Sequence, residues 1–372
     1  MSFERVVHLT SAHPRYDTRI FYKMCSSLAA NGYDVTLVVA DGLGNEVNNG
    51  VNIVDAGAGS GGRLSRMTRA VSRVFLQAKK LNADIYHLHD PEFVFVGLRL
   101  KRLGKKVIFD SHEDVPKQLL SKPYLNITLL RILSIAFGML ERYACSRFDG
   151  IIAATPFIRD KFLAINPHTV DINNYPMIGE LDAAVPWAGK RDEICYVGGI
   201  GAIRGIREIV KACEYLLSGA RLNLAGCFSE PAVEAEVKTC PGWRRVNELG
   251  FVDRHGVREV LGRSVAGLVT FLPLPNHIDA QPNKMFEYMS AGIPVIASNF
   301  PLWREIIEGN DCGICVDPLD PAAIAAAIDY VMNNPERARQ MGENGRRAIL
   351  EKFNWAVEEV KLKAFYQSVL SA

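Results

Sequence analysis

The sequence lacks a strong net charge and any composition typical of disorder. Its 43 Lys and Arg residues nearly balance its 41 Asp and Glu residues, and the net charge of +2 argues against a surface built as a whole for nucleic acid. The hydrophobic fraction of 48% is that of a soluble globular protein. The 372 residues are too many for one ordinary core, so we expect two domains.

The chain also lacks a long uninterrupted apolar run. The most apolar window, 125–140, contains Arg131 and is followed directly by Glu141 and Arg142. Such a window is short and charged for a membrane-spanning helix, and we expect a buried or interfacial helix there. The first eight residues, Met-Ser-Phe-Glu-Arg-Val-Val-His, hold no apolar core of a signal peptide. We therefore expect a cytoplasmic protein.

Cysteine motifs for a metal are scarce. Cys312 and Cys315 form one CxxC, without a second pair or a nearby His, so a turn entering a strand is favoured over a zinc or redox site. Most cysteines lie in apolar or periodic segments, which predicts reduced, buried side chains. The other six are Cys25, Cys145, Cys195, Cys213, Cys227 and Cys240.

Short apolar runs alternate with helical patterns along the first half of the chain. The alternation predicts a parallel sheet with right-handed crossovers. Residues 173–191, rich in Asn, Pro and Gly, break the pattern and are interpreted as a linker. The expected strands are 6–9, 35–40, 51–54, 85–88, 107–110 and 150–154.

The alternation restarts at residue 194, which predicts a second α/β half. Ligands of open parallel sheets bind at the carboxyl ends of the strands, and two such edges facing each other would form a cleft. We expect an N-terminal domain at 1–175 and a C-terminal domain at 190–352. The expected elements are strands 194–197, 222–225, 246–249, 265–271 and 294–297, and helices 206–217, 282–290, 321–332 and 335–372, the last with a break near 353–355.

A glycine-rich turn, 198–205, follows the first strand of the second half. Glycines let the backbone approach a phosphate, and the N-terminus of the next helix supplies free N–H groups. Arg204 could make two parallel hydrogen bonds to that phosphate. The spacing is not GxGxxG, so a dinucleotide fingerprint is absent and a plain strand–helix turn remains the alternative.

A second segment, 279–297, combines a short helix with a following strand. Pro282 suits a first helical turn, where its missing N–H costs nothing. Lys284 in that turn would face an anion, and Glu287 could accept hydrogen bonds from a ribose diol. The alternative is a solvated i,i+3 pair of Lys284 and Glu287. An apolar strand directly after Gly292 favours a helix packed into a sheet domain.

This second segment resembles the donor-binding motif of the retaining GT-B glycosyltransferases of family 4. These enzymes carry two acidic residues separated by seven and then an Ala-Gly-x-Pro turn, which here are Asp279, Glu287 and 291–294. The stretch 286–289, Phe-Glu-Tyr-Met, is similar to the variant of bacterial polysaccharide transferases. Arg204-Gly205 resembles the pair that clamps the diphosphate, and 250–252 resembles a segment near the nucleobase.

The resemblance implies the GT-B fold: two Rossmann-like parallel-sheet domains facing across a cleft, with the helix 355–372 packing back onto the first. It implies a UDP- or GDP-sugar donor as co-substrate, retention of anomeric configuration, and neither a metal nor another cofactor. The family often has Arg where this chain has Gly199, so Arg204 and Lys284 are the expected substitutes. The implied donor-binding residues are Gly199, Arg204, Gly205, Phe251, Val252, Asn283, Lys284 and Glu287.

The first half carries its own candidates. His112 follows the strand 107–110 at its carboxyl end, and in the resembling family a His there contacts the transferred sugar. A helix cap by Ser111 or Asp114 is the alternative. With His112, the resemblance implies Asp279 and Glu287 as catalytic residues.

Three further residues are candidate substrate contacts in the first half. Asp17 and Arg19 lie in a loop that closes over substrates in family members, and Asp17 or Thr18 could instead cap the next helix. His89 ends the strand 85–88. A metal held by His89 with Asp90, His112 and Glu113 is conceivable, but cationic side chains and helix ends already suit a diphosphate.

Two segments raise the prospect of peripheral contact with the inner face of a membrane. Arginines and lysines alternate with apolar residues along 63–81, and the window 125–140 is apolar. A core-facing helix with a solvated basic face is the alternative for the first. We expect transfer to a glycan or lipid-linked saccharide in cell-surface polysaccharide synthesis. Two hypotheses compete with this one: a sugar-nucleotide epimerase or hydrolase, and a non-catalytic partner subunit of a transferase complex.

Overall fold

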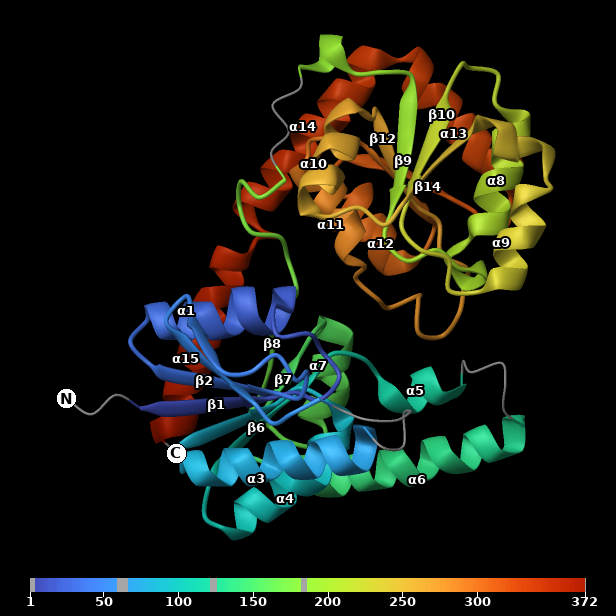
Figure 1. The fold of residues 1–372 in the computed structure, drawn as a ribbon. Coiled ribbons are helices and arrows are strands. Elements are labelled where there is room, and N and C mark those ends of the chain that lie inside the picture. The colour runs from blue at the N-terminus through green and yellow to red at the C-terminus, as the bar shows by residue number, and fades with distance from the viewer. Residues whose placement is uncertain (1–3, 59–65, 121–125, 182–185, 372) are drawn as a thin grey trace. The chain divides into compact units, whose positions relative to one another are not determined.

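The computed structural model describes residues 4–58, 66–120, 126–181 and 186–371, without the side chains of 66, 67 and 188. It divides into two compact α/β units (Figure 1). Unit 1 is Met1–Asn174 with Trp355–Ala372, and unit 2 is Tyr175–Asn354. The sequence placed the domain ends at 175 and 352. No helix of the described residues is long and apolar enough to cross a bilayer.

Unit 1 is built on an eight-stranded sheet in the order β3-β4-β2-β1-β5-β6-β7-β8, parallel except where β3 pairs with β4. All six expected strands are confirmed to within a residue or two. Strands β3 and β8 were not predicted, because each has three residues and neither is fully buried. The bounds are β1 Arg5–Leu9, β2 Asp34–Val39, β3 Glu46–Asn48, β4 Val51–Asp55, β5 Ile85–Leu88, β6 Lys106–Ser111, β7 Gly150–Ala153 and β8 Thr169–Asp171.

Helices cover this sheet, and the last helix of the chain is one of them. Gly150 on β7 leaves room for α15 to pack against the sheet, since a Cβ there would lie 2.4 Å from the Phe365 ring. The Trp355 indole N–H donates to Ser27 at 2.9 Å. The helical segments of unit 1 are η1 Thr18–Cys25, α1 Ser26–Ala30, η2 Arg66–Ala70, α3 Val71–Leu81, η3 Pro91–Phe93, α4 Val94–Arg102, α5 Val115–Leu120, α6 Ile127–Cys145, α7 Pro156–Leu163 and α15 Trp355–Ser371.

The basic stretch predicted at 63–81 lies partly on α3. Val71, Val74 and Ala78 of this helix are buried in the core, whereas Lys79 and Lys80 are exposed. The described part is therefore a core-facing helix with a basic outer face, which was the alternative to a membrane-lying one. Residues 63–65 of that stretch lie outside the described residues.

Unit 2 is a six-stranded, fully parallel sheet in the order β11-β10-β9-β12-β13-β14. The five expected strands are confirmed. At the CxxC, a turn entering a strand was expected, and the strand is β14. It begins directly after Cys312 and contains Cys315. The bounds are β9 Glu193–Val197, β10 Arg221–Ala225, β11 Val246–Gly250, β12 Ala266–Val269, β13 Val295–Ser298 and β14 Gly313–Val316. All eight cysteines lie among the described residues and are free.

Two apolar layers cover the two faces of this sheet. One contains side chains of α8 and α13, and the other contains those of α10, α11 and α12. The helical segments of unit 2 are η4 Trp187–Gly189, η5 Ala202–Arg204, α8 Ile206–Tyr215, α9 Pro231–Lys238, η6 Pro241–Arg245, α10 Arg254–Arg263, α11 Asn283–Ser290, α12 Pro301–Ile307, α13 Pro321–Asn333 and α14 Pro335–Glu351.

One packing contact fixes α11 beside the end of β9. Tyr288 of α11 fills the space left by Gly267, where a Cβ would lie 2.3 Å from the ring. The buried Tyr288 hydroxyl accepts a hydrogen bond from the backbone N–H of Val197 at 3.0 Å. Because Val197 ends β9, this contact holds the predicted motif helix next to the glycine-rich turn. The helix begins at Asn283, one residue later than expected, with Pro282 as its N-cap.

Candidate active site

The glycine-rich turn of unit 2 has a backbone that only glycine adopts easily. Gly198 and Gly205 have φ of 106° and 79°. A Cβ at Gly205 would lie 2.0 Å from the carbonyl oxygen of Thr270, so the turn is pressed against the end of β12. At Gly199 a Cβ would lie 2.5 Å from Nη1 of Arg204. The bare backbone at 199 therefore leaves room for the Arg204 guanidinium, which donates to the Gly199 carbonyl oxygen at 2.9 Å.

Lys284 brings a second cation to this turn. Its side chain is 7% exposed, and its Nζ has no hydrogen-bond partner within the described part of the chain. The Nζ lies 3.5 Å from the centroid of the Tyr196 ring and would be 3.6 Å from a Cβ at Gly198. Burial, and then the nearby Arg204 charge, lower the pKa of Lys284 well below its ordinary value, although Glu287 works the other way.

These two cations make the turn a site for an anion. An unpaired buried ammonium is costly, and a bound anion removes that cost. Across residues 186–371, no carboxylate forms an ion pair with Arg204 or Lys284. The free N–H groups at the start of α8 add to the positive potential.

Glu287 lies one turn beyond Lys284 on α11. Its carboxylate accepts a hydrogen bond from Nη1 of Arg254 at 2.6 Å, and Arg254 also pairs with Glu180. The pair of Lys284 with Glu287 expected as an alternative does not form; Arg254 takes that place. Arg254 starts α10, and its role could not be predicted from local sequence patterns because 33 residues separate it from its partner.

The remaining candidates of unit 2 lie on loops around the turn and α11. Phe251 is 80% exposed directly after β11, and Val252 is partly buried beside it. Asn283 is exposed at the first position of α11, and Asp279 is partly buried in the loop that leads from β12 to that helix. Arg204, Lys284 and Gly199 lie together at the glycine-rich turn. The exposed ring of Phe251 lies on a different loop and could contact another part of a ligand.

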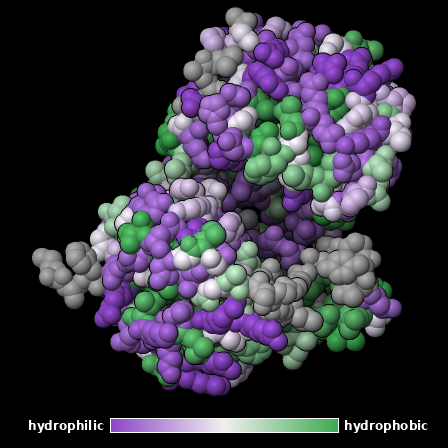
Figure 2. Space-filling model, in the orientation of Figure 1, coloured by the Kyte–Doolittle hydropathy of each residue, from purple (hydrophilic) through white to green (hydrophobic). Residues whose placement is uncertain are grey.

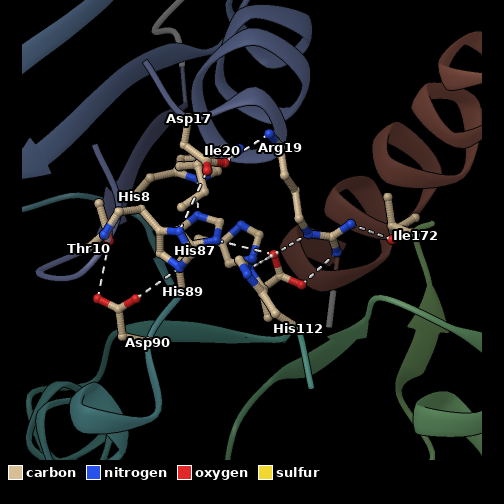
Figure 3. A network of polar contacts seen from close by, with 12 residues as sticks. His8, Thr10, Asp17, Arg19, Ile20, His87, His89, Asp90, His112 and Ile172 are labelled. Atoms are coloured by element: carbon tan, nitrogen blue, oxygen red, sulfur yellow. Dashed lines mark hydrogen bonds and ion pairs between the residues drawn. The ribbon is translucent and has the colours of Figure 1, made fainter. Parts of the chain in front are cut away.

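Unit 1 gathers polar side chains at the carboxyl ends of β1, β5 and β6, among them Thr10, His89 and His112 (Figure 3). The Asp110 carboxylate accepts from Nε and Nη2 of Arg19 at 3.0 and 2.7 Å. It also contacts His89 Nδ1 at 3.1 Å and His112 Nε2 at 2.9 Å. Burial alone would raise the pKa of Asp110, but Arg19 and His112 hold it well below its usual range.

The candidate residues of the first half differ in how deeply they are buried. The His112 side chain is 20% exposed and is oriented from beneath by Asp110. Arg19 is buried, and its third nitrogen donates to the carbonyl oxygen of Ile172 at 2.7 Å. His89 is buried between Asp110 and His8, with His8 Nδ1 2.8 Å from His89 Nε2. Only His112 of these three side chains reaches the surface of unit 1.

Asp17 caps η1, as its capping alternative predicted. Its carboxylate accepts from the backbone N–H groups of Arg19 and Ile20 at 2.8 and 2.9 Å and lies 3.6 Å from His13. Burial acts to raise the pKa of Asp17, but His13 and the backbone N–H of Ile20 outweigh it and lower the pKa to about 2. Asp17 is thus ionised and partly exposed at the rim of the network.

Among the described residues, the groups that could geometrically hold a metal differ from the predicted set. They are His8 with His87 and His89, and His89 with Asp110 and His112. Asp90 is not among them; its carboxylate accepts hydrogen bonds from the hydroxyl and the backbone N–H of Ser11 at 3.3 and 2.6 Å. Burial lowers the pKa of His8 and His87 well below the ordinary value, so both rings are neutral at pH 7.

Two family profiles match the chain and together span most of it. Residues 178–348 match glycosyl transferases group 1, and residues 18–172 match glycosyltransferase family 4. The chain belongs to the GT-B glycosyltransferases of family 4. One match lies within each of the two units, so this family 4 glycosyltransferase has both α/β domains of the fold and is an enzyme of the transferase class.

Individual relatives agree with this assignment. An uncharacterised glycosyltransferase of Methanocaldococcus jannaschii is 24% identical over 291 residues, which are 73% of this chain and 72% of that one. Among solved structures, sucrose-phosphate synthase from Thermosynechococcus elongatus superposes with a TM-score of 0.80 at 17% identity, over 99% of both chains. Anabaena HepE, solved with UDP, has a TM-score of 0.74 at 12% identity, over 98% of this chain and 100% of that one. Alignments with the first curated relatives span 55% to 72% of those proteins.

Proposed function

We propose that this family 4 glycosyltransferase moves a sugar from a nucleoside-diphosphate sugar to a saccharide acceptor with retention of anomeric configuration. The observation that carries the proposal is the buried Nζ of Lys284, which has no hydrogen-bond partner among the described residues and lies beside Arg204 at a glycine-rich turn. A bound diphosphate would place negative charges next to these two cations. UDP is the favoured carrier, because HepE shares the fold and was solved with UDP.

The chemistry follows from where charge develops. When the glycosidic bond breaks, its electron pair leaves with the diphosphate, and negative charge grows on the leaving oxygen. Arg204 and Lys284 are already placed where they can neutralise that charge without reorganising. Such preorganised charges are the main way that sites of this kind lower the activation barrier. Because two protein cations and a helix N-terminus serve the diphosphate, the reaction as proposed needs no metal ion.

Glu287 would bind the ribose. Arg254 donates to one of its oxygens and keeps the carboxylate fixed, which leaves lone pairs for the two ribose hydroxyls. The exposed ring of Phe251 after β11 is suited to stack on the base. Asp279 and Asn283 flank the same helix start and are proposed to contact the sugar and the diphosphate.

Unit 1 would supply the acceptor side of the reaction. His112 is held by the ionised Asp110, so its imidazole presents a fixed edge and a nearby negative charge that favour positive charge at the anomeric carbon. Arg19 and His89 act through Asp110 rather than by contact, since both are buried and paired. Asp17 remains the rim residue able to bind an acceptor hydroxyl. We propose a glycan or lipid-linked saccharide of the cell surface as acceptor.

The test begins with thermal shifts of the full chain in UDP, GDP, ADP and their sugars, because a ligand that binds the native state raises the melting temperature. The nucleotide that stabilises the protein is then supplied as its sugar with candidate saccharides, and the product linkage is assigned by proton NMR. Glycoside formation with the donor configuration kept supports the proposal. Rapid donor turnover without acceptor, or no effect of Glu287→Ala and Arg204→Ala on transfer, would overturn it.

A further inference from the structure

Helix α6 buries one face in unit 1, and the described residues leave an apolar face on another side of it exposed. Leu130, Ser134, Glu141, Ala144 and Cys145 are buried. A second set of apolar side chains on the same helix is exposed by 41% to 69%. This set, called the outer stripe below, consists of Leu129, Ile132, Leu133, Ile135, Met139 and Tyr143.

The outer stripe is continuous. At about 100° per residue, its members from Leu129 to Tyr143 fall within an arc of about 160°, on the side of α6 opposite the buried residues. Helix α5 packs on a different side, where the Ser134 hydroxyl donates to the Pro116 carbonyl oxygen at 2.9 Å and Gly138 faces the Pro116 ring. In Figure 1, α6 extends past the edge of the sheet, and Figure 2 shows apolar side chains gathered over that region at the lower right.

The charges on α6 indicate what covers the stripe. Its basic residues, Arg131 and Arg142, are exposed and fall about 20° apart on the helical projection, along one margin of the stripe. The helix contains one acidic residue, Glu141, which is buried and paired with Lys161 at 2.6 Å. Beyond the helix, Arg147 stacks on the Tyr143 ring at 3.7 Å. The exposed surface of α6 is therefore apolar and basic.

We infer that the outer stripe of α6 docks on an anionic lipid bilayer. An apolar face with arginines at its margin places its side chains among acyl chains while the guanidinium groups reach the phosphates. A symmetric second copy of the chain is less suited, because a two-fold contact would bring the same arginines together. Docking would bring a lipid-linked acceptor to unit 1, and in that respect it rests on the proposed function.

Vesicle binding of the full chain tests this inference without donor or acceptor. Wild type should sediment with vesicles of phosphatidylcholine and phosphatidylglycerol much more than with phosphatidylcholine alone. Ile135→Asp with Met139→Asp should lower partitioning about 30-fold or more, since both side chains would leave the bilayer. Arg131→Gln with Arg142→Gln should lower it about fivefold for each arginine, only on anionic vesicles.

A matched control comes from unit 2, where Leu217 and Leu319 are exposed by 93% and 57%. Leu217→Asp with Leu319→Asp should bind vesicles as wild type does, and circular dichroism should show that both double variants remain folded. Equal binding by the α6 variant, or no binding by wild type, would overturn the inference. So would a dimer in analytical ultracentrifugation that Ile135→Asp with Met139→Asp dissociates. Vesicle binding and sugar transfer are measured separately, so either proposal can fail alone.

Discussion

Replacing Lys284 by Met should separate a binding role of this side chain from a structural one. Methionine keeps the apolar stem but removes the ammonium, which is buried without a hydrogen-bond partner in the described residues. Losing an unpaired buried charge relieves a desolvation cost, whereas losing the contact with the Tyr196 ring removes about 1–2 kcal/mol. We expect the free energy of unfolding of the ligand-free protein to stay unchanged or to rise by up to about 2 kcal/mol.

Binding of the nucleotide should change in the opposite direction. A hydrogen bond from a charged donor contributes about 1.5–3 kcal/mol, so Lys284→Met should weaken UDP about 10- to 150-fold. Urea denaturation and isothermal titration with UDP, on the same protein samples, give the two quantities. Lys211→Met is the control, since it removes the same charge from an exposed position on α8. If Lys284→Met lowered stability by more than about 1 kcal/mol and left UDP affinity within about twofold, Lys284 would be structural.

Four other results are expected. UDP affinity should fall as pH rises toward the ordinary pKa of lysine, because the pKa of Lys284 is lowered in the free protein and a bound diphosphate favours its protonated form; titrations in buffers of different ionisation enthalpy should show the linked proton uptake, absent in Lys284→Met. Gly205→Ala should abolish UDP binding, because its Cβ would lie 2.0 Å from a backbone oxygen, whereas Gly219→Ala, with its nearest neighbour at 4.0 Å, should bind normally. Asp110→Asn should cost about 3–5 kcal/mol in urea denaturation, because Arg19 loses its buried carboxylate. Unit 1 should lose stability in calorimetry as pH falls below 6.5, since its three buried histidines have lowered pKa values and bind protons only when unfolded.

Much of the fold follows from local patterns in the sequence. Apolar runs of four to seven residues bounded by turn residues identified the central strands, because a strand buried on both faces must be apolar throughout. The short edge strands β3 and β8 carry no such run and were missed. The glycine-rich turn and α11 could be located from the sequence. Glycines indicate a turn that needs backbone freedom, and an apolar run after Gly292 indicates the strand that follows the helix.

Pairings between distant residues could not be predicted in this way. Arg254 with Glu287, and Arg19 with Asp110, join side chains 33 and 91 residues apart that come together only in the folded sheet edges. The sequence therefore suggested Arg19 as a substrate contact, whereas the structure gives its nitrogens to Asp110 and Ile172. For α6, the sequence indicated a buried or interfacial helix, and only tertiary packing shows which of its apolar faces is left uncovered.

The central claim is that the donor nucleotide binds the turn and helix of unit 2. Hydrogen–deuterium exchange of the full chain, with and without the nucleoside diphosphate that raises its melting temperature, tests this most directly. Bound nucleotide should slow amide exchange in 198–206 and in α11, and Lys284→Met should weaken that protection at a fixed nucleotide concentration. Protection confined to unit 1, or unchanged exchange in both segments at saturating nucleotide, would contradict the account.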